Sequence, residues 1–163
     1  MDFYYPNLNN DMWRIMGLCF FYERDYFLTP RKNGYEEQKI RQFLQEKGIA
    51  ISDTAKQVIR LKENASDKYL QIVQTMDIAG LLEQLPQCNA IVTTGQKASD
   101  TLMSILPVIP ATPAVGSSVE FVWNRRKMRF YRMPSSSRAY PKPLAEKAMV
   151  YQGMFRETGL LDV

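Results

Sequence analysis

The chain has 163 residues and a formal net charge of +4, which suits one domain with a single core. A mildly basic balance permits nucleic-acid binding without requiring it. The sequence contains no histidine, which excludes Ser-His-Asp triads, Cys-His dyads and histidine-based metal sites.

The first half of the chain predicts two helices and one short strand. Apolar residues at helical spacing predict a helix over residues 9–21 and another over residues 38–46, which Gly48 ends. The apolar, β-branched run at residues 49–51 predicts a buried strand. A helical turn at residues 54–60 and a polar loop at residues 62–68 are expected to follow.

The second half alternates strands and helices. Strands are predicted at residues 90–94, 119–123 and 127–132, and helices at residues 77–85, 97–106 and 144–155. A proline-rich connector at residues 107–113 separates two of these elements. The alternation predicts one α/β domain over residues 1–163, a three-layer α/β/α sandwich with a mostly parallel central sheet.

Ligands of such sheets bind beyond the carboxyl ends of the strands. Three loops are expected to meet there: residues 53–54, residues 95–97 and residues 134–138, here called the serine loop. The serine loop reads Pro-Ser-Ser-Ser-Arg and follows a predicted strand. Its hydroxyls and backbone amides suit a phosphate, although the same composition is typical of ordinary loops.

Two other features remain open from the residues alone. Cys19 and Cys88 stand in apolar surroundings, which favours buried thiols over a disulfide or a metal site. A basic cluster beside the serine loop fits either a nucleic-acid contact or a solvated hairpin turn. Its members are Arg125, Arg126, Lys127, Arg129, Arg132 and Arg138.

Four stretches resemble the uracil-DNA glycosylase superfamily. Residues 133–138, Met-Pro-Ser-Ser-Ser-Arg, resemble its DNA-intercalation motif, especially in the mismatch-specific thymine/uracil branch. Residues 2–15 resemble the aromatic-Pro-Asn segment of the mismatch-specific and hypoxanthine-type enzymes, with Asn10 and Trp13 as the Asn-x-x-Trp that opens the next helix. Residues 48–53 and 94–98 resemble strand ends of the same family.

The resemblance implies a DNA repair glycosylase that flips a uracil, mismatched or deaminated base and hydrolyses its N-glycosidic bond. Tyr5 would stack on the base, with Asn7 beside it, and Arg138 would fill the vacated stack. The phosphates would be gripped by Pro134, Ser135, Ser136 and Ser137. Lys97 could touch a phosphate or be solvated.

Asp53 could orient water or the base, or cap the next turn. The expected partner is double-stranded DNA with a damaged or mismatched base. Neither a metal nor an organic cofactor is expected. We also expect a monomer without membrane contact, located in the cytoplasm and used at the nucleoid.

One departure from the family pattern matters. The family places its first core strand and a catalytic Gly-x-x-Pro-Gly-like loop directly before the aromatic segment, whereas this chain starts at Met1. We therefore expect the 163-residue chain to be poorly soluble or inactive and a version extended upstream to be active. The alternatives are a non-catalytic DNA-binding paralogue and a small-molecule α/β enzyme whose serine loop holds a ligand phosphate.

Overall fold

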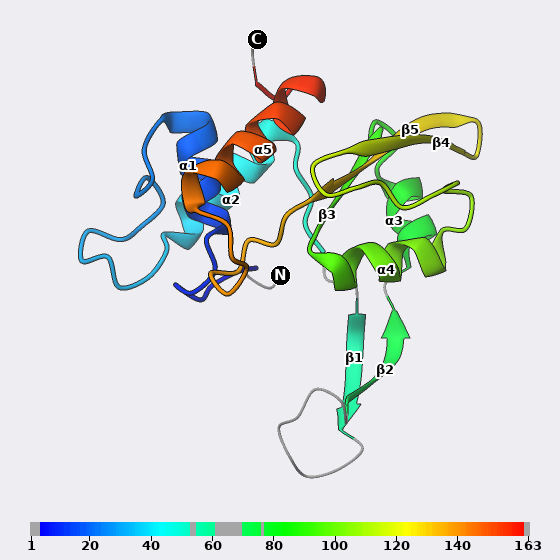
Figure 1. Ribbon diagram of the computed structural model, residues 1–163, viewed down its shortest axis with the longest axis horizontal. Coiled ribbons are helices and arrows are strands. Elements are labelled where there is room, and N and C mark those ends of the chain that lie inside the picture. Colours follow the sequence, from blue (N-terminus) through cyan, green and yellow to red (C-terminus); the bar gives the residue numbers. More distant parts are fainter. Residues whose placement is uncertain (1–3, 53–54, 61–69, 76, 162–163) are drawn as a thin grey trace.

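The computed structural model describes residues 4–52, 55–60, 70–75 and 77–161. The described residues form a mixed α/β structure of helices and short strands (Figure 1). The helices are α1 (Met12–Phe21), α2 (Glu37–Lys47), α3 (Ile78–Gln84), α4 (Gln96–Ile105) and α5 (Leu144–Glu157). The strands are β1 (Ala55–Arg60), β2 (Leu70–Thr75), β3 (Ala90–Thr94), β4 (Ser118–Trp123) and β5 (Arg126–Met133).

A three-stranded sheet in the order β3-β5-β4 positions the site. β3 runs parallel to β5, with Ala90 opposite Arg129 and Thr94 opposite Met133. β4 runs antiparallel to β5 and joins it through a two-residue turn. Both turn residues, at positions 124 and 125, have positive φ, as a type I′ hairpin requires. The sheet therefore combines one parallel and one antiparallel pair, and β1 and β2 form a separate antiparallel hairpin.

Two hydrophobic clusters form the interior. Figure 1 shows α1, α2 and α5 packed on one side of the molecule, with the sheet, α3 and α4 on the other. The helical cluster includes Trp13, Ile40 and Tyr151, and the sheet cluster includes Leu102 and Phe130. Strand β5 contributes to both clusters, so it joins the two sides of the molecule.

Local signals in the sequence account for most of the helices. Helix α2 ends at Gly48, which takes the left-handed conformation at φ +70°. The Asp77 carboxylate accepts a hydrogen bond from the Gly80 amide and so caps α3. The Asn10 side chain accepts a hydrogen bond from the Met12 amide at the start of α1. The predicted helices and the predicted strands around the basic turn are confirmed to within a few residues.

Two predicted elements are wrong. Residues 49–51 form no strand, because within the described chain β3 pairs only with β5 and no neighbouring strand lies against them. Residues 55–60 form β1 rather than a helical turn, because they pair with β2. The loop predicted at residues 62–68 and the residue pair 53–54 lie outside the described residues. Among the described helices, none has the length and apolar character needed to cross a bilayer.

Candidate functional site

Helix α5 fixes the serine loop through two backbone carbonyls. The Tyr151 hydroxyl donates a hydrogen bond of 2.6 Å to the Pro134 carbonyl. The Lys147 ammonium donates one of 2.7 Å to the Ser137 carbonyl, although its side chain is buried. Burial lowers the pKa of Lys147, because the charged form loses hydration. The loop is thus held at both ends by one helix.

The segment before α1 pairs with the serine loop. The Asp11 amide donates to the Ser136 carbonyl at 2.7 Å, and the Arg138 amide donates to the Asn9 carbonyl at 3.0 Å. The segment before α1 and the serine loop therefore lie against each other, although they are far apart in the sequence.

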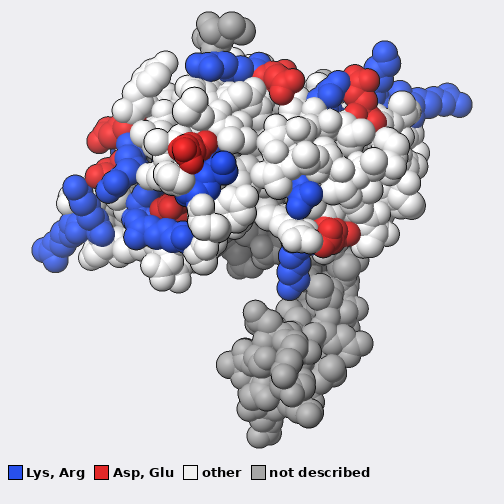
Figure 2. All heavy atoms as spheres, viewed as in Figure 1, with Lys and Arg blue, Asp and Glu red and all other residues white. Residues whose placement is uncertain are grey.

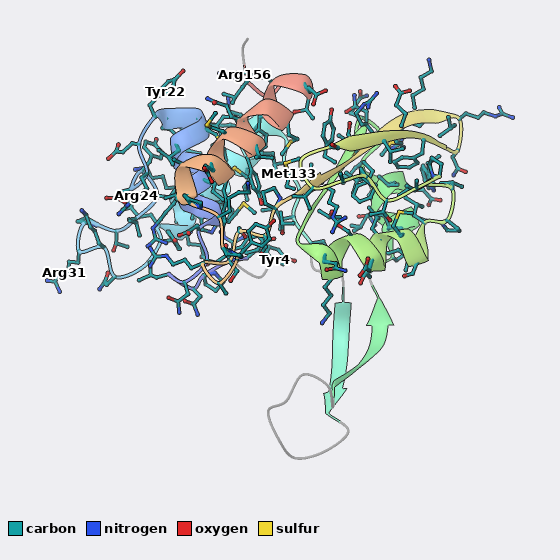
Figure 3. The ribbon with its side chains drawn as sticks, viewed as in Figure 1. Tyr4, Tyr22, Arg24, Arg31, Met133 and Arg156 are labelled. Atoms are coloured by element: carbon teal, nitrogen blue, oxygen red, sulfur yellow. The ribbon has the colours of Figure 1, made fainter. Side chains whose placement is uncertain are left out.

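Tyr5 is held between α1 and the carboxyl end of β3. Its hydroxyl lies 3.3 Å from the Thr94 hydroxyl, and its ring meets the Trp13 ring edge-on at 6.2 Å. The Trp13 indole N–H also donates to the Tyr4 carbonyl at 3.2 Å. Tyr4 and Met133 both lie in the middle of the molecule, whereas Arg31 points outward at its edge (Figure 3). The aromatic segment is therefore anchored, with one edge of Tyr5 directed at the strand end.

A polar pocket of about 290 Å³ lies where these segments meet. It opens beyond the carboxyl ends of β3 and β5, the expected place for a ligand in an α/β sheet. Its walls come from the aromatic segment, the end of the segment that follows α2, the β3–α4 turn and the serine loop. The lining residues are Tyr5, Asn10, Ser52, Thr94, Lys97, Ala98, Ser135 and Ser136.

The pocket favours an anionic or hydrogen-bonding ligand. Of its described lining residues one is charged, Lys97, in the first turn of α4. The amino-terminal end of a helix carries partial positive charge, which adds to that of the lysine. Gly95 turns the chain from β3 into α4 at φ +91°, a conformation that residues with a Cβ rarely adopt. The Ser99 hydroxyl secures this turn by hydrogen bonds to the Thr93 hydroxyl and the Gly95 carbonyl.

A buried carboxylate positions Arg138. Asp11 accepts hydrogen bonds from the Arg14 guanidinium at 2.7 Å and from Arg138 Nε at 3.2 Å. The side chains of Asp11 and Arg14 are each 8% exposed, whereas that of Arg138 is 52% exposed. Arg14 also donates to the Leu8 carbonyl. Arg138 is therefore tethered at its base, with its outer surface open to solvent beside the serine loop.

Most of the predicted site residues are brought together. Tyr5, Lys97, Ser135 and Ser136 line the pocket, and Ser137 and Arg138 lie next to it in the serine loop.

Two predicted site residues do not line the pocket, and a third is not described. Pro134 is fully buried, so it can support the loop but cannot touch DNA with its ring. The side-chain oxygen Oδ1 of Asn7 accepts a hydrogen bond from the Asn9 amide, which makes a local turn. Asp53 lies outside the described residues.

Besides Arg138, three residues of the basic cluster make contacts within the protein. The Arg126 guanidinium donates to three carbonyls at the end of α3 and beyond it. Arg129 pairs with Glu120 at 2.7 Å, and Arg132 donates to the Pro113 carbonyl. Figure 2 shows the basic side chains gathered on the helical side and at the β4–β5 end, with mostly uncharged atoms between. These contacts favour the structural interpretation for this part of the cluster.

Sequence reasoning did not assign site roles to several residues. Asn10 and Thr94 stand in stretches that carry the resemblance, so a signal for them existed. Ser52 also stands in such a stretch, at residues 48–53. The support given by Asp11 and Lys147 depends on contacts across the fold, and nothing in their local sequence indicates it.

The chain matches no protein-family model, no curated protein and no solved structure.

Proposed function

We propose that this protein acts on double-stranded DNA as a glycosylase of the uracil-DNA glycosylase type, releasing a flipped uracil, mismatched or deaminated base. The observation that carries the proposal is the convergence on one pocket. Four stretches chosen by resemblance, at residues 2–15, 48–53, 94–98 and 133–138, all contribute side chains to it. Strand direction alone predicts that the loops after β3 and β5 meet, so the support comes from the aromatic segment, which joins them at the same pocket.

The residues have separate roles in this proposal. Tyr5 stacks on the extruded base, since an aromatic ring can stack on the face of any base. The amides and hydroxyls of the half-buried Ser135 and Ser137 hold the flanking phosphate, and the buried Ser136 supports the loop between them. Arg138 enters the space that the base leaves, where a planar guanidinium can stack and donate hydrogen bonds. Asp11 positions Arg138 through its carboxylate.

The architecture in this proposal is a three-layer α/β/α sandwich. What supports this is the mixture of helices with a small sheet that has one parallel pair, β3 and β5.

A second candidate is a DNA-binding protein without hydrolytic activity. The pocket composition favours it, because Lys97 is the single charged residue among the described lining residues and no carboxylate is in that set. A cationic, hydroxyl-rich pocket suits a phosphate without supplying a general base.

Substitution of Tyr5 tests the proposal. The substitution is made in the version that releases base from a duplex, the 163-residue chain or the one extended upstream of Met1. In single-turnover reactions of that version, Tyr5→Ala should slow base release by at least about tenfold while duplex affinity falls by less than about threefold. Tyr5→Phe keeps the ring and loses only the contact with the Thr94 hydroxyl, so it serves as the matched control.

Equal losses of rate and affinity in Tyr5→Ala would count against stacking on a flipped base. Affinity that falls with salt, without base release by any form, would favour the second candidate.

A further inference from the structure

The amino-terminal end of α4 presents backbone amides that have no partner among the described residues. Gly95 stands at the cap position and has no side chain that could accept a hydrogen bond from them. The Ser99 amide donates to the Gly95 carbonyl and so makes the first bond of the helix. The amides of residues 96–98 therefore remain as donors, at the end of the helix that carries partial positive charge.

The Ser136 hydroxyl is a second donor without a partner in the described part of the chain. Ser136 is 2% exposed, yet it lines the polar pocket beside α4. Its hydroxyl is not sealed inside the protein, because Arg14 Nε is the one enclosed side-chain nitrogen or oxygen without a partner in the described residues. Buried polar groups normally have a hydrogen-bond partner, so a hydroxyl that lacks one and borders a pocket indicates a ligand.

The pocket brings these donors close to Tyr5. Tyr5, Lys97, Ala98 and Ser136 line the same space of about 290 Å³. In the proposed function, on which this inference rests, the extruded base stacks on Tyr5. A base in so small a space has its edge within reach of the α4 amides and of the Ser136 hydroxyl. Uracil, thymine and hypoxanthine all carry carbonyl oxygens on that edge, and these oxygens accept hydrogen bonds.

The described part of the pocket offers the departing base no strong acid. When the bond between the base nitrogen and C1′ of the sugar breaks, its electron pair stays on the base. A water oxygen then bonds to C1′ and releases a proton to solvent. Tyr5 and Lys97 are the titratable groups among the described lining residues, and both side-chain types are weak acids at neutral pH. The base therefore leaves as an anion, with charge on its carbonyl oxygens, and takes its proton from solvent afterwards.

We propose that the amino-terminal end of α4 and the Ser136 hydroxyl bind the carbonyl oxygen on which this negative charge develops. Donors that are fixed in place stabilise such a charge well, because they need no reorientation as the bond breaks. Lys97 is exposed at the pocket and adds positive charge at the same end of α4. Ser136 then contacts the base, besides supporting the loop between the two serines that hold the phosphate.

Binding of free bases to the full chain tests the proposal without DNA. 5-Fluorouracil loses a proton in mildly alkaline solution, whereas 1,3-dimethyluracil has a similar ring and no such proton to lose. Between about pH 6 and about pH 9, the affinity for 5-fluorouracil should rise by at least about fivefold, because its anion is the preferred form. The amide resonances of residues 96–98 should shift as it binds. The affinity for 1,3-dimethyluracil should not change with pH.

Ser136→Ala is the informative variant, because its hydroxyl has no partner within the described protein. Its Tm should change by less than about 3 °C. Its affinity for 5-fluorouracil at about pH 9 should fall about tenfold, the loss expected for a hydrogen bond to a charged group, with 1,3-dimethyluracil unaffected. Ser104→Ala is the matched control on α4. The Ser104 hydroxyl donates to the Thr101 carbonyl, away from the pocket, so this variant should bind both bases as the wild type does.

Three results would overturn the proposal. The first is an affinity for 5-fluorouracil that does not change with pH, or no binding of either base. The second is equal binding by Ser136→Ala and the wild type. The third is a shift of the amides of residues 96–98 by inorganic phosphate at lower concentration than by 5-fluorouracil, since these donors would then serve a phosphate. Base binding and strand breakage in DNA are separate measurements, so this site can fail while the proposed function holds, and the reverse.

Discussion

Asp11 holds two arginines that differ sharply in exposure, so their substitution should have different effects. Arg138→Ala removes a half-exposed side chain, and exposed ion pairs contribute little to stability. We expect the Tm to change by less than about 3 °C and the affinity for a mismatch duplex to fall about tenfold. A thermal melt and a titration at fixed salt measure both. A large loss of Tm would make Arg138 a structural residue instead.

Asp11→Ala provides the contrast at the same site. It leaves the buried Arg14 guanidinium without its carboxylate, and an uncompensated buried charge costs about 3–5 kcal/mol. Denaturant unfolding should show a loss of that size, and Asp11→Asn should show a smaller one because a hydrogen-bond acceptor remains. A loss below about 1 kcal/mol for Asp11→Ala would show that Arg14 finds other partners.

Burial of Cys19 should make the stability of the protein depend on pH. Burial raises the pKa of the Cys19 thiol to about 12, whereas an exposed thiol titrates near about 8.5. Between these values the unfolded chain loses a proton that the folded chain keeps, so stability falls as pH rises. From pH 7.5 to 10, the free energy of unfolding of the wild type should fall by about 2 kcal/mol more than that of Cys19→Ala. Equal pH dependence in the two proteins would contradict the burial of Cys19.

The two thiols should also differ in reactivity. Both are free, and the half-buried Cys88 should react before the buried Cys19 with a thiol reagent at pH 8.

At the scale of elements, we expect the hydrogen bond from Lys147 of α5 to hold the serine loop in place. Lys147→Met keeps the length of the side chain and removes the hydrogen bond to the Ser137 carbonyl. Loss of a desolvated charge offsets the lost bond, so stability should change by less than about 1 kcal/mol. The amides of residues 135–138 should exchange faster and duplex affinity should fall. Lys142→Met removes the same charge nearby and serves as the control. Unchanged exchange in the loop would show that α5 does not hold it.

Elements with local signals could be predicted from the sequence, and elements that depend on distant partners could not. Gly48 ends α2, and Asp77 caps the start of α3. Both signals lie next to the helix that they mark, so α2 and α3 were predictable from the sequence. Residues 55–60 form a strand because β2 lies beside them, and residues 49–51 form none because β3 lies across a groove. In the first case a partner strand is present and in the second it is missing, and both outcomes override the local propensity.

At the scale of the whole molecule, part of the candidate site could be predicted from the sequence and part could not. The meeting of the β3–α4 turn and the serine loop was predicted from strand direction, and both line the polar pocket. Other parts of the site depend on contacts across the fold. The burial of Pro134, the tether of Arg138 to Asp11 and the bond from Lys147 are examples, and no pattern in the sequence indicates them.

The central claim is that this pocket serves removal of a base from DNA. The most direct measurement is strand breakage after alkali on labelled duplexes that contain uracil, a G·T mismatch or hypoxanthine. The 163-residue chain is compared with a version extended upstream of Met1. We predict alkali-sensitive breaks at the modified position with the extended version on at least one duplex. Intact strands on all three duplexes with both versions would contradict the claim.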